Sequence, residues 1–124
     1  MLDYVMVGCT DLDRAAGFYD AIFAPLGYTR TETGDSYVLY GANGHGQFYV
    51  TKPYNGRPMT AGNGTMLTVK AATLDALAAF HAAALAHGGT DEGKPGERPA
   101  GSGSHYAYIR DLDGNKICAS CTPG

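Results

Sequence analysis

Residues 12–27 read LDRAAGFYDAIFAPLG, and residues 74–89 read LDALAAFHAAALAHGG. Both stretches begin with Leu-Asp, place a phenylalanine five residues after the aspartate and place a glycine fourteen residues after it. Their offset of 62 residues is half the length of the 124-residue chain. Strand-like runs at residues 4–7 and 66–69 precede them at the same offset. Because matches at one fixed period indicate a repeated structural unit, the sequence predicts a duplication.

Each half is predicted to contain a strand, a helix and then short strands. Apolar residues at helical spacing predict helices that start near Asp11 and Thr73, which are good N-caps, and end by Gly27 and Gly89. Further strands are predicted between turn residues, at 28–33, 36–41, 47–51, 104–110 and 116–121. The stretch 111–115, DLDGN, lacks the Gly and Glu positions of an EF-hand and is predicted to be a hairpin turn.

The segment from Gly88 to Gly103 is rich in glycine and proline. This composition predicts a solvated surface loop, since such connections run over protein surfaces. The alternative is a rim over a pocket, with Arg98 binding an anion.

Composition limits the classes of function. The net charge of −3, with no Lys/Arg cluster, argues against nucleic-acid binding. No apolar stretch is long enough to span a membrane, and the N-terminus lacks the pattern of a secretion signal. Three cysteines without a disulfide framework suit a reducing cytoplasm, where we expect the protein to be located.

Alternation along the strands separates two faces. Val5, Val7, Leu67 and Val69 are predicted to pack against the helices, as are alternate residues of the last two strands. The opposite face carries Tyr, Met, Thr, Gln, Lys, Cys and Arg side chains. Such a mixture is typical of a small-molecule cavity, with apolar walls and a few directed polar groups.

Several motifs resemble the vicinal oxygen chelate superfamily, which includes glyoxalase I, extradiol dioxygenases, bleomycin resistance proteins and fosfomycin-modifying enzymes. They are Asp3-Tyr4-Val5, residues 11–14 (DLDR), Phe18-Tyr19, residues 26–28 (LGY) and residues 111–117 (DLDGNKI). The resemblance covers essentially the whole chain. It implies an α+β fold of two βαβββ modules, 1–60 and 61–124, in one domain. The modules would form a curved mixed sheet around a cavity, with the helices on the outer face, in a homodimer.

The resemblance also implies four metal-ligand positions, and here the sequence departs from the family. Where metal-dependent members carry His, His or Gln, and Glu, this chain has Tyr4, Met66 and Cys118. The fourth position falls at Tyr49, with a register uncertain by one residue. Divalent ions of this family prefer imidazole and carboxylate, so we expect no metal and no other cofactor.

The remaining reactive residues favour structural roles. Cys118 has no neighbouring base or cation in sequence to activate a thiolate, so we expect it to form part of a cavity wall. Cys118 and Cys121 are predicted to point to opposite faces, which argues against a disulfide. His105 is expected at a strand end or an interface, whereas His45, His81 and His87 are expected on the surface.

The sequence leaves several functions open. The leading hypothesis is a protein that binds a small organic molecule without metal, with Arg98 and Lys70 as possible anion contacts. The predicted ligand-binding residues are Tyr4, Tyr49, Met66, Tyr106, Tyr108, Cys118 and Arg98. The four tyrosines could form an aromatic box or simply fill a closed face. The alternatives are a glyoxalase-like lyase or dioxygenase with non-standard ligands, and a structural module without a cavity.

Overall fold

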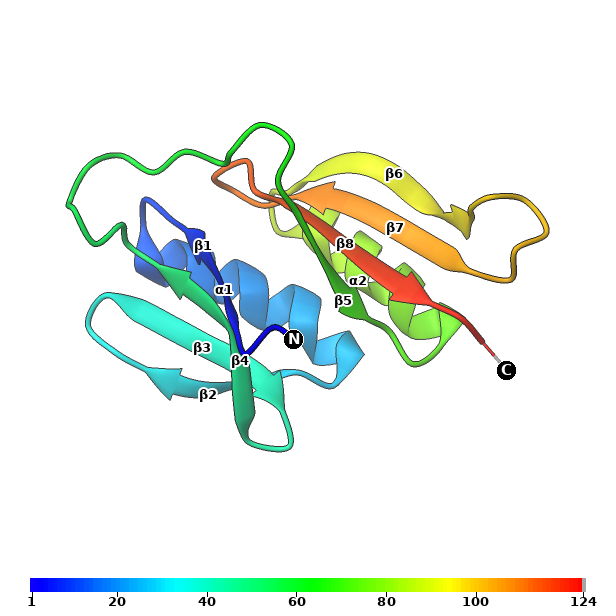
Figure 1. Cartoon of the computed structure of the whole chain (residues 1–124), viewed down its shortest axis with the longest axis horizontal. Helices are drawn as coiled ribbons and strands as arrows, with labels where there is room; N and C mark the ends of the chain where they lie inside the picture. Colours follow the sequence, from blue (N-terminus) through cyan, green and yellow to red (C-terminus); the bar gives the residue numbers. More distant parts are fainter. Residues whose placement is uncertain (124) are drawn as a thin grey trace.

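The computed structural model describes residues 1–123 and contains two units with the same order of elements (Figure 1). The first unit consists of β1 (Val5–Gly8), α1 (Leu12–Phe23), a 3-10 turn η1 (Ala24–Leu26), β2 (Thr29–Thr33), β3 (Tyr37–Ala42) and β4 (His45–Thr51). The second consists of β5 (Met66–Lys70), α2 (Leu74–Ala86), β6 (Thr90–Glu97), β7 (His105–Arg110) and β8 (Lys116–Cys121). The structure therefore has the predicted α+β fold of two βαβββ modules.

Each module forms its own four-stranded sheet, in the orders β1-β4-β3-β2 and β5-β8-β7-β6. The first strand of each module pairs in parallel with the last, and the other pairings are antiparallel. Met6 lies opposite Tyr49 in the first sheet, and Thr68 lies opposite Cys118 in the second. Since Met6 and Thr68 are 62 residues apart, Tyr49 and Cys118 are structural counterparts, as the sequence predicted.

The repeat is visible at the helix starts. Both helices begin at the leucine of the Leu-Asp pair, and the side chains of Asp11 and Thr73 cap them by accepting hydrogen bonds from Arg14 N and Ala76 N. The ends differ by one residue. Gly27 has a φ of 81° after the first helix, whereas Gly88, with a φ of 95°, takes that role after the second.

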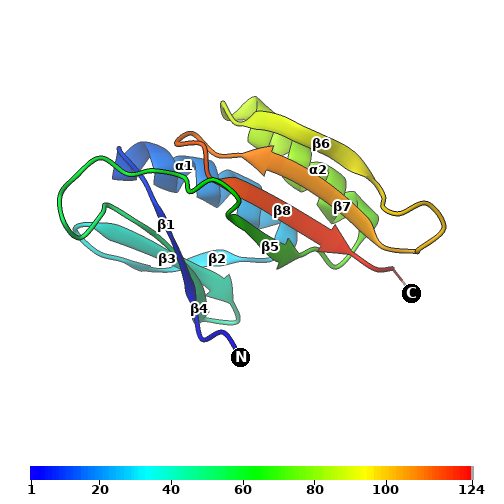
Figure 2. The ribbon, with the colours of Figure 1, turned by 45° about the horizontal axis from the view of Figure 1, so that its top comes forward.

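The two modules share one hydrophobic core. Figures 1 and 2 show both helices side by side on the same side of the two sheets. Phe18 of α1, Phe80 of α2, and inward residues of both sheets such as Val7 and Ile117 belong to a single buried cluster. The predicted inward faces of the strands are therefore confirmed. At Gly89 an added Cβ would come within 2.9 Å of the Phe18 ring, so only glycine permits this close contact between the modules.

The predicted loop from Gly88 to Gly103 is wrong in its first part, because Thr90–Glu97 forms edge strand β6 against β7. Its register shifts between Asp91 and Gly93 and again between Gly93 and Gly96. Pro95 falls within the second irregularity, where a residue without an N–H group is tolerated. The glycines and the proline interrupt any alternation of apolar residues, so no strand was predicted in this segment.

The stretch from Asp111 to Asn115 is a turn between β7 and β8, as predicted, but its ends are buried. The Asp111 carboxylate accepts hydrogen bonds from the Tyr19 hydroxyl at 2.5 Å, from the Asn115 amide at 2.8 Å and from two backbone N–H groups of the turn. The Asn115 amide also donates to the Gly8 carbonyl oxygen at 2.8 Å. The turn of the second module is therefore fastened to β1 and α1 of the first.

His81 is not on the surface, contrary to the sequence prediction. It is 7% exposed, and its Nε2 lies 2.9 Å from a carboxylate oxygen of Asp91 on β6. Alanines occur on every side of α2, so the apolar residues of its sequence do not identify the buried face. The surface prediction for His81 was wrong for this reason. No helix within residues 1–123 is long and apolar enough to cross a membrane.

Candidate functional site: an aromatic cleft between the sheets

A cleft of about 400 Å³ opens between the two sheets, and we call it the inter-sheet cleft. Its first wall is aromatic and comes from the first module: Tyr4, Phe23, Tyr28, Tyr40 and Phe48. Its second wall is the end of β5, with Thr68, Val69 and Lys70. The volume is in the range that small-molecule sites occupy in proteins.

The aromatic wall is built at the end of α1. Phe23 packs edge-on against Tyr40 and Phe48, with ring centroids 5.3 and 5.0 Å apart. Pro25 in η1 and the left-handed Gly27 then reverse the chain and bring the Tyr28 ring to 5.6 Å from Phe23. Edge-to-face contacts of this kind hold rings in fixed positions. The wall is therefore ordered by packing within one module.

Two tyrosines of this wall have their hydroxyl groups bound inside the protein. Tyr28 donates to the Lys70 carbonyl oxygen at 2.7 Å, which ties the two walls together. Tyr40 donates to Asp20 at 2.7 Å. Burial raises the pKa of both phenols, and for Tyr40 the Asp20 carboxylate raises the pKa further. Both hydroxyls therefore stay protonated at neutral pH, so they cannot act there as bases.

The polar groups of the cleft lie at its rim. Lys70, Thr68, Asp3 and Gln47 contribute the charged and hydrogen-bonding side chains. The ion pairs within the described chain are Arg30–Asp20, His81–Asp91 and Arg110–Glu92, so the Lys70 ammonium group is not in one. No histidine lines the cleft as described. The arrangement suits binding of an organic molecule with an anionic or hydrogen-bonding group.

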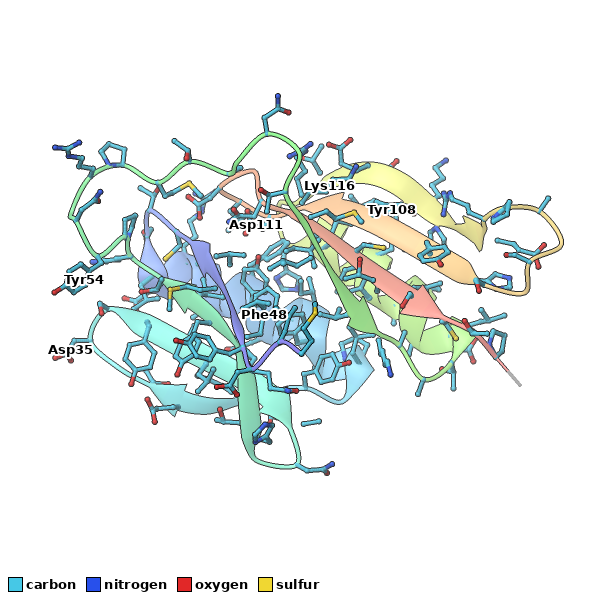
Figure 3. The ribbon with its side chains drawn as sticks, viewed as in Figure 1. Asp35, Phe48, Tyr54, Tyr108, Asp111 and Lys116 are labelled. Atoms are coloured by element: carbon cyan, nitrogen blue, oxygen red, sulfur yellow. The ribbon has the colours of Figure 1, made fainter. Side chains whose placement is uncertain are left out.

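The structure separates the seven predicted ligand-binding residues into two groups. Tyr4 lines the inter-sheet cleft, and Tyr49 lies beside it on β4, with ring centroids 5.1 Å apart. The other five lie on the second sheet or at its edge: Met66, Tyr106, Tyr108, Cys118 and Arg98. In Figure 3, Tyr108 lies over the second sheet, well away from Phe48 in the cleft wall.

The residues of this second group contact one another. Tyr106 and Tyr108 stack at 6.2 Å, and the Arg98 guanidinium lies 5.1 Å from the Tyr108 ring centroid. Arg98 also donates to the carbonyl oxygens of Tyr106 and Lys94, each at 2.7 Å. Two of its nitrogens thus support the irregular edge strand β6, which limits what Arg98 can offer to an anion.

Cys118 is fully buried on β8, facing Thr68 and Tyr108 across the strand pairings. Burial raises the pKa of its thiol, with smaller opposing effects from the Thr68 hydroxyl and nearby cations. The thiolate is the nucleophilic form of cysteine, and this environment disfavours it. Cys118 does not line the inter-sheet cleft, so its predicted role as a cavity-wall residue stays a prediction.

The family's metal-ligand positions do not fit a divalent metal. Tyr4 and Tyr49 offer phenols on the first sheet, while Met66 and Cys118 offer a thioether and a buried thiol on the second. Divalent ions of the hard or borderline kind prefer carboxylate and imidazole. Within residues 1–123 no group of three His, Cys, Asp or Glu side chains could hold a metal ion.

Sequence reasoning missed most of the aromatic wall. It assigned Phe48 to the core by strand alternation, and Phe48 is indeed 5% exposed. Alternation sorts the two faces of a sheet, whereas this cleft opens at the edge between two sheets. The tyrosine after Leu26-Gly27 was the available signal, because Tyr28 follows directly on the turn that closes the helix.

Comparison with known proteins agrees with the geometry. The family model for the Glyoxalase/Bleomycin resistance protein/Dioxygenase superfamily matches residues 1–119. A glyoxalase/bleomycin resistance protein from Albidiferax ferrireducens T118 is 42% identical, with a TM-score of 0.90 and 99% of each chain covered. No curated protein matches this chain.

Two more distant structures share the fold. A glyoxalase-related enzyme from Fulvimarina pelagi is 19% identical, with a TM-score of 0.75, over 98% of this chain and 87% of that one. A V278E glyoxalase I mutant from Zea mays is 22% identical, with a TM-score of 0.75, over 96% of this chain and 45% of the plant protein. On the family match and the 42% identity, this chain belongs to the glyoxalase/bleomycin resistance protein/dioxygenase superfamily.

Proposed function

We propose that this protein binds a small organic molecule in the inter-sheet cleft and does so without the metal of its metal-dependent relatives. The observation that carries the proposal is the cleft itself, about 400 Å³ in volume, with five aromatic residues on one wall. Ligand sites typically combine such apolar walls with a few polar groups that orient the ligand.

The lining defines the chemistry of the ligand. Tyr4 and the half-buried Tyr28 offer accessible ring surface, backed by the buried rings of Phe23 and Phe48, which favours a flat and largely apolar body. The ammonium group of Lys70 at the rim favours a ligand that carries one anionic group.

We further propose a homodimer located in the cytoplasm. On its face turned away from the helices, the first sheet exposes a large apolar side chain, Met6, at 54% exposure. A second copy would cover Met6, and Tyr49, which lies opposite Met6 in the sheet, would then lie near the interface. Sedimentation equilibrium tests this, because a single 13.0 kDa species at all concentrations would contradict it. The three free, buried cysteines are compatible with a reducing compartment.

Anilinonaphthalene sulfonate is a suitable probe for the cleft, because it joins flat rings to one anionic group. We expect saturable binding to the wild-type chain, weaker binding to Lys70→Met, and little binding to Ala42→Phe, which places a ring inside the cleft. Lys94→Met is the matched control, because Lys94 is exposed and does not line the cleft. Equal binding by all variants would contradict the proposal.

Whether the protein binds a metal ion is tested by a separate measurement. Protein purified without chelator or affinity nickel should contain no stoichiometric metal, and Ni²⁺, Zn²⁺, Mn²⁺ and Fe²⁺ should leave its melting temperature unchanged. One tightly bound metal ion per chain would overturn the metal-free proposal and redirect attention to lyase or dioxygenase chemistry.

A further inference from the structure

A second recess lies at the opposite end of β5 from the inter-sheet cleft. It has a volume of about 410 Å³ and is lined by residues 62–66 together with Arg110 and Lys116. It shares no lining residue with the cleft. Figure 3 shows Lys116 at the start of β8, over the second sheet and near Tyr108. We call this feature the basic recess.

The two cations of the basic recess differ in how they are held. Arg110 donates through Nε to Glu92 and through Nη1 to the Gly114 carbonyl oxygen at 2.9 Å, so its guanidinium has a fixed orientation. The Lys116 ammonium lies 5.4 Å from the Tyr108 ring centroid, and no carboxylate of the described chain pairs with it. The recess therefore combines an oriented guanidinium with an ammonium group that lacks a counter-ion.

The local charge is opposite to that of the whole protein. Arg98, Arg110 and Lys116 lie around Tyr108 and the recess, and Glu92 is the carboxylate that pairs with this group. The excess is positive, whereas the chain as a whole carries a net charge of −3. Because Arg110 is already paired with Glu92, the uncompensated positive charge is that of Arg98 and Lys116, and a bound anion would pair with Lys116.

The opposite wall of the recess is small and polar. Gly62 and Gly64 have φ values of 79° and 94°, and Thr65 N donates to the Gly62 carbonyl oxygen at 3.2 Å, which closes a tight turn. Asn63 and Thr65 supply the polar side chains of this turn, and the 42% exposed Met66 supplies an apolar surface next to it. This wall leaves room for a ligand rather than filling the recess with side chains.

From these observations we propose that the basic recess binds the carboxylate or phosphate group of a small organic molecule, as a site separate from the inter-sheet cleft. Arg110 uses Nε and Nη1 for contacts within the protein, so its Nη2 would donate to an oxygen of the anion, while the Lys116 ammonium adds a point charge. Met66 would contact the organic part of the ligand. The proposal does not rest on the function proposed for the cleft.

Phenyl phosphate, followed by heteronuclear NMR, tests the proposal, with inorganic phosphate and phenol as comparison probes. We expect phenyl phosphate to shift the amide signals of Gly64, Thr65 and Lys116, inorganic phosphate to shift the same signals more weakly, and phenol to leave them unchanged. Lys116→Met should weaken phenyl phosphate binding by about ten-fold, the scale of one lost charge-assisted contact. Lys116→Arg should largely retain it.

Lys70→Met separates the two sites, because Lys70 lines only the cleft. If Lys70→Met weakens phenyl phosphate binding and Lys116→Met does not, the anion binds in the cleft and the proposal is overturned. Equal binding of phenol and phenyl phosphate, or no binding at millimolar concentration, would overturn it as well. Each variant is first compared with the wild type by thermal unfolding, and Lys116→Arg decides the matter if Lys116→Met is unstable.

Discussion

The two modules share one order of elements and differ in what fills it. The first module packs rings against rings: Phe18, Tyr19, Phe23, Tyr40 and Phe48 form a connected aromatic cluster. The inward positions of the last two strands of the second module carry Ala107, Ile109, Ile117 and Ala119. The same order of helices and strands can therefore be filled by different core side chains. The aromatic module supplies the wall of the inter-sheet cleft, and the aliphatic module supplies the cations of the basic recess.

The last hairpin of each module shows a second difference. In the first module Asn43 and Gly44 join β3 to β4, both with positive φ, which is the usual two-residue hairpin turn. In the second module the turn from Asp111 to Asn115 is longer and reaches the first module through Tyr19 and Gly8. One hairpin closes a sheet, whereas the other also joins the two modules.

Replacing Asp111 by alanine should have the largest effect on stability, because this residue joins the two modules. The change removes the acceptor of Tyr19, of the Asn115 amide and of two backbone N–H groups in a buried place. We expect the free energy of unfolding, measured in urea, to fall by roughly 3 kcal/mol, since buried donors without partners are costly.

Asp35→Ala is the matched control, because Asp35 is an exposed carboxylate in the β2–β3 turn of the first module. Its effect should stay within about 0.5 kcal/mol, as for most surface substitutions. If Asp111→Ala were as mild as this control, the turn would not join the modules energetically.

A smaller effect is expected from exchanging one residue between the helices. Gly17 in α1 and Ala79 in α2 are exposed and 62 residues apart, and a Cβ added at Gly17 meets no atom within 4 Å. Gly17→Ala should stabilise the protein by about 1 kcal/mol and Ala79→Gly should destabilise it by a similar amount, because glycine is a poor helix former. The double variant should unfold at nearly the wild-type urea concentration. A large deviation from this additivity would show that the two helices respond to each other.

The smallest expected effect concerns acid sensitivity, which we assign to β6 of the second module. The pKa of Asp91 is lowered by hydrogen bonds from His81 and Gly93 N, and that of Glu97 by the N–H groups of Gly101 and Gly103. Carboxyls with lowered pKa stabilise the fold above their ordinary values near 4, and this contribution is lost as the pH falls through the folded pKa.

Asp91→Asn and Glu97→Gln should therefore be less stable than the wild type at pH 7 and approach it in acid. Urea unfolding from about pH 7 down to about pH 2, a range that brackets ordinary carboxyl pKa values, measures this difference. Asp35→Asn serves as the control and should follow the wild-type profile. If the stability of Asp91→Asn and Glu97→Gln depended on pH as that of the wild type does, the acid sensitivity would arise from other groups in the molecule.

The repeat explains why the order of helices and strands could be predicted from the sequence. The capping residues Asp11 and Thr73, at which the sequence predicts the helices to start, lie one residue before the observed helices. Strand alternation identified inward residues such as Val7 and Ile117. These features are local, because they depend on spacing within one element.

The missed features are non-local. Strand β6 is held by its pairing with β7 despite three interruptions by glycine and proline, and His81 is buried because of where α2 packs. The inter-sheet cleft arises from the way two sheets meet, which no pattern within a strand records. The predicted residues Tyr4 and Cys118 belong to different sheets, and their relation depends on the same packing.

The single core has a consequence for the origin of the chain. Phe18 and Phe80 lie in one buried cluster, so a lone half would expose the ring that the other half covers. An ancestor of half this length would have needed a companion molecule to hide that surface. The duplication that the 62-residue offset predicts would have joined the two copies in one chain. The two halves would then have been free to differ, as they do in the aromatic cluster of the first and the cations of the second.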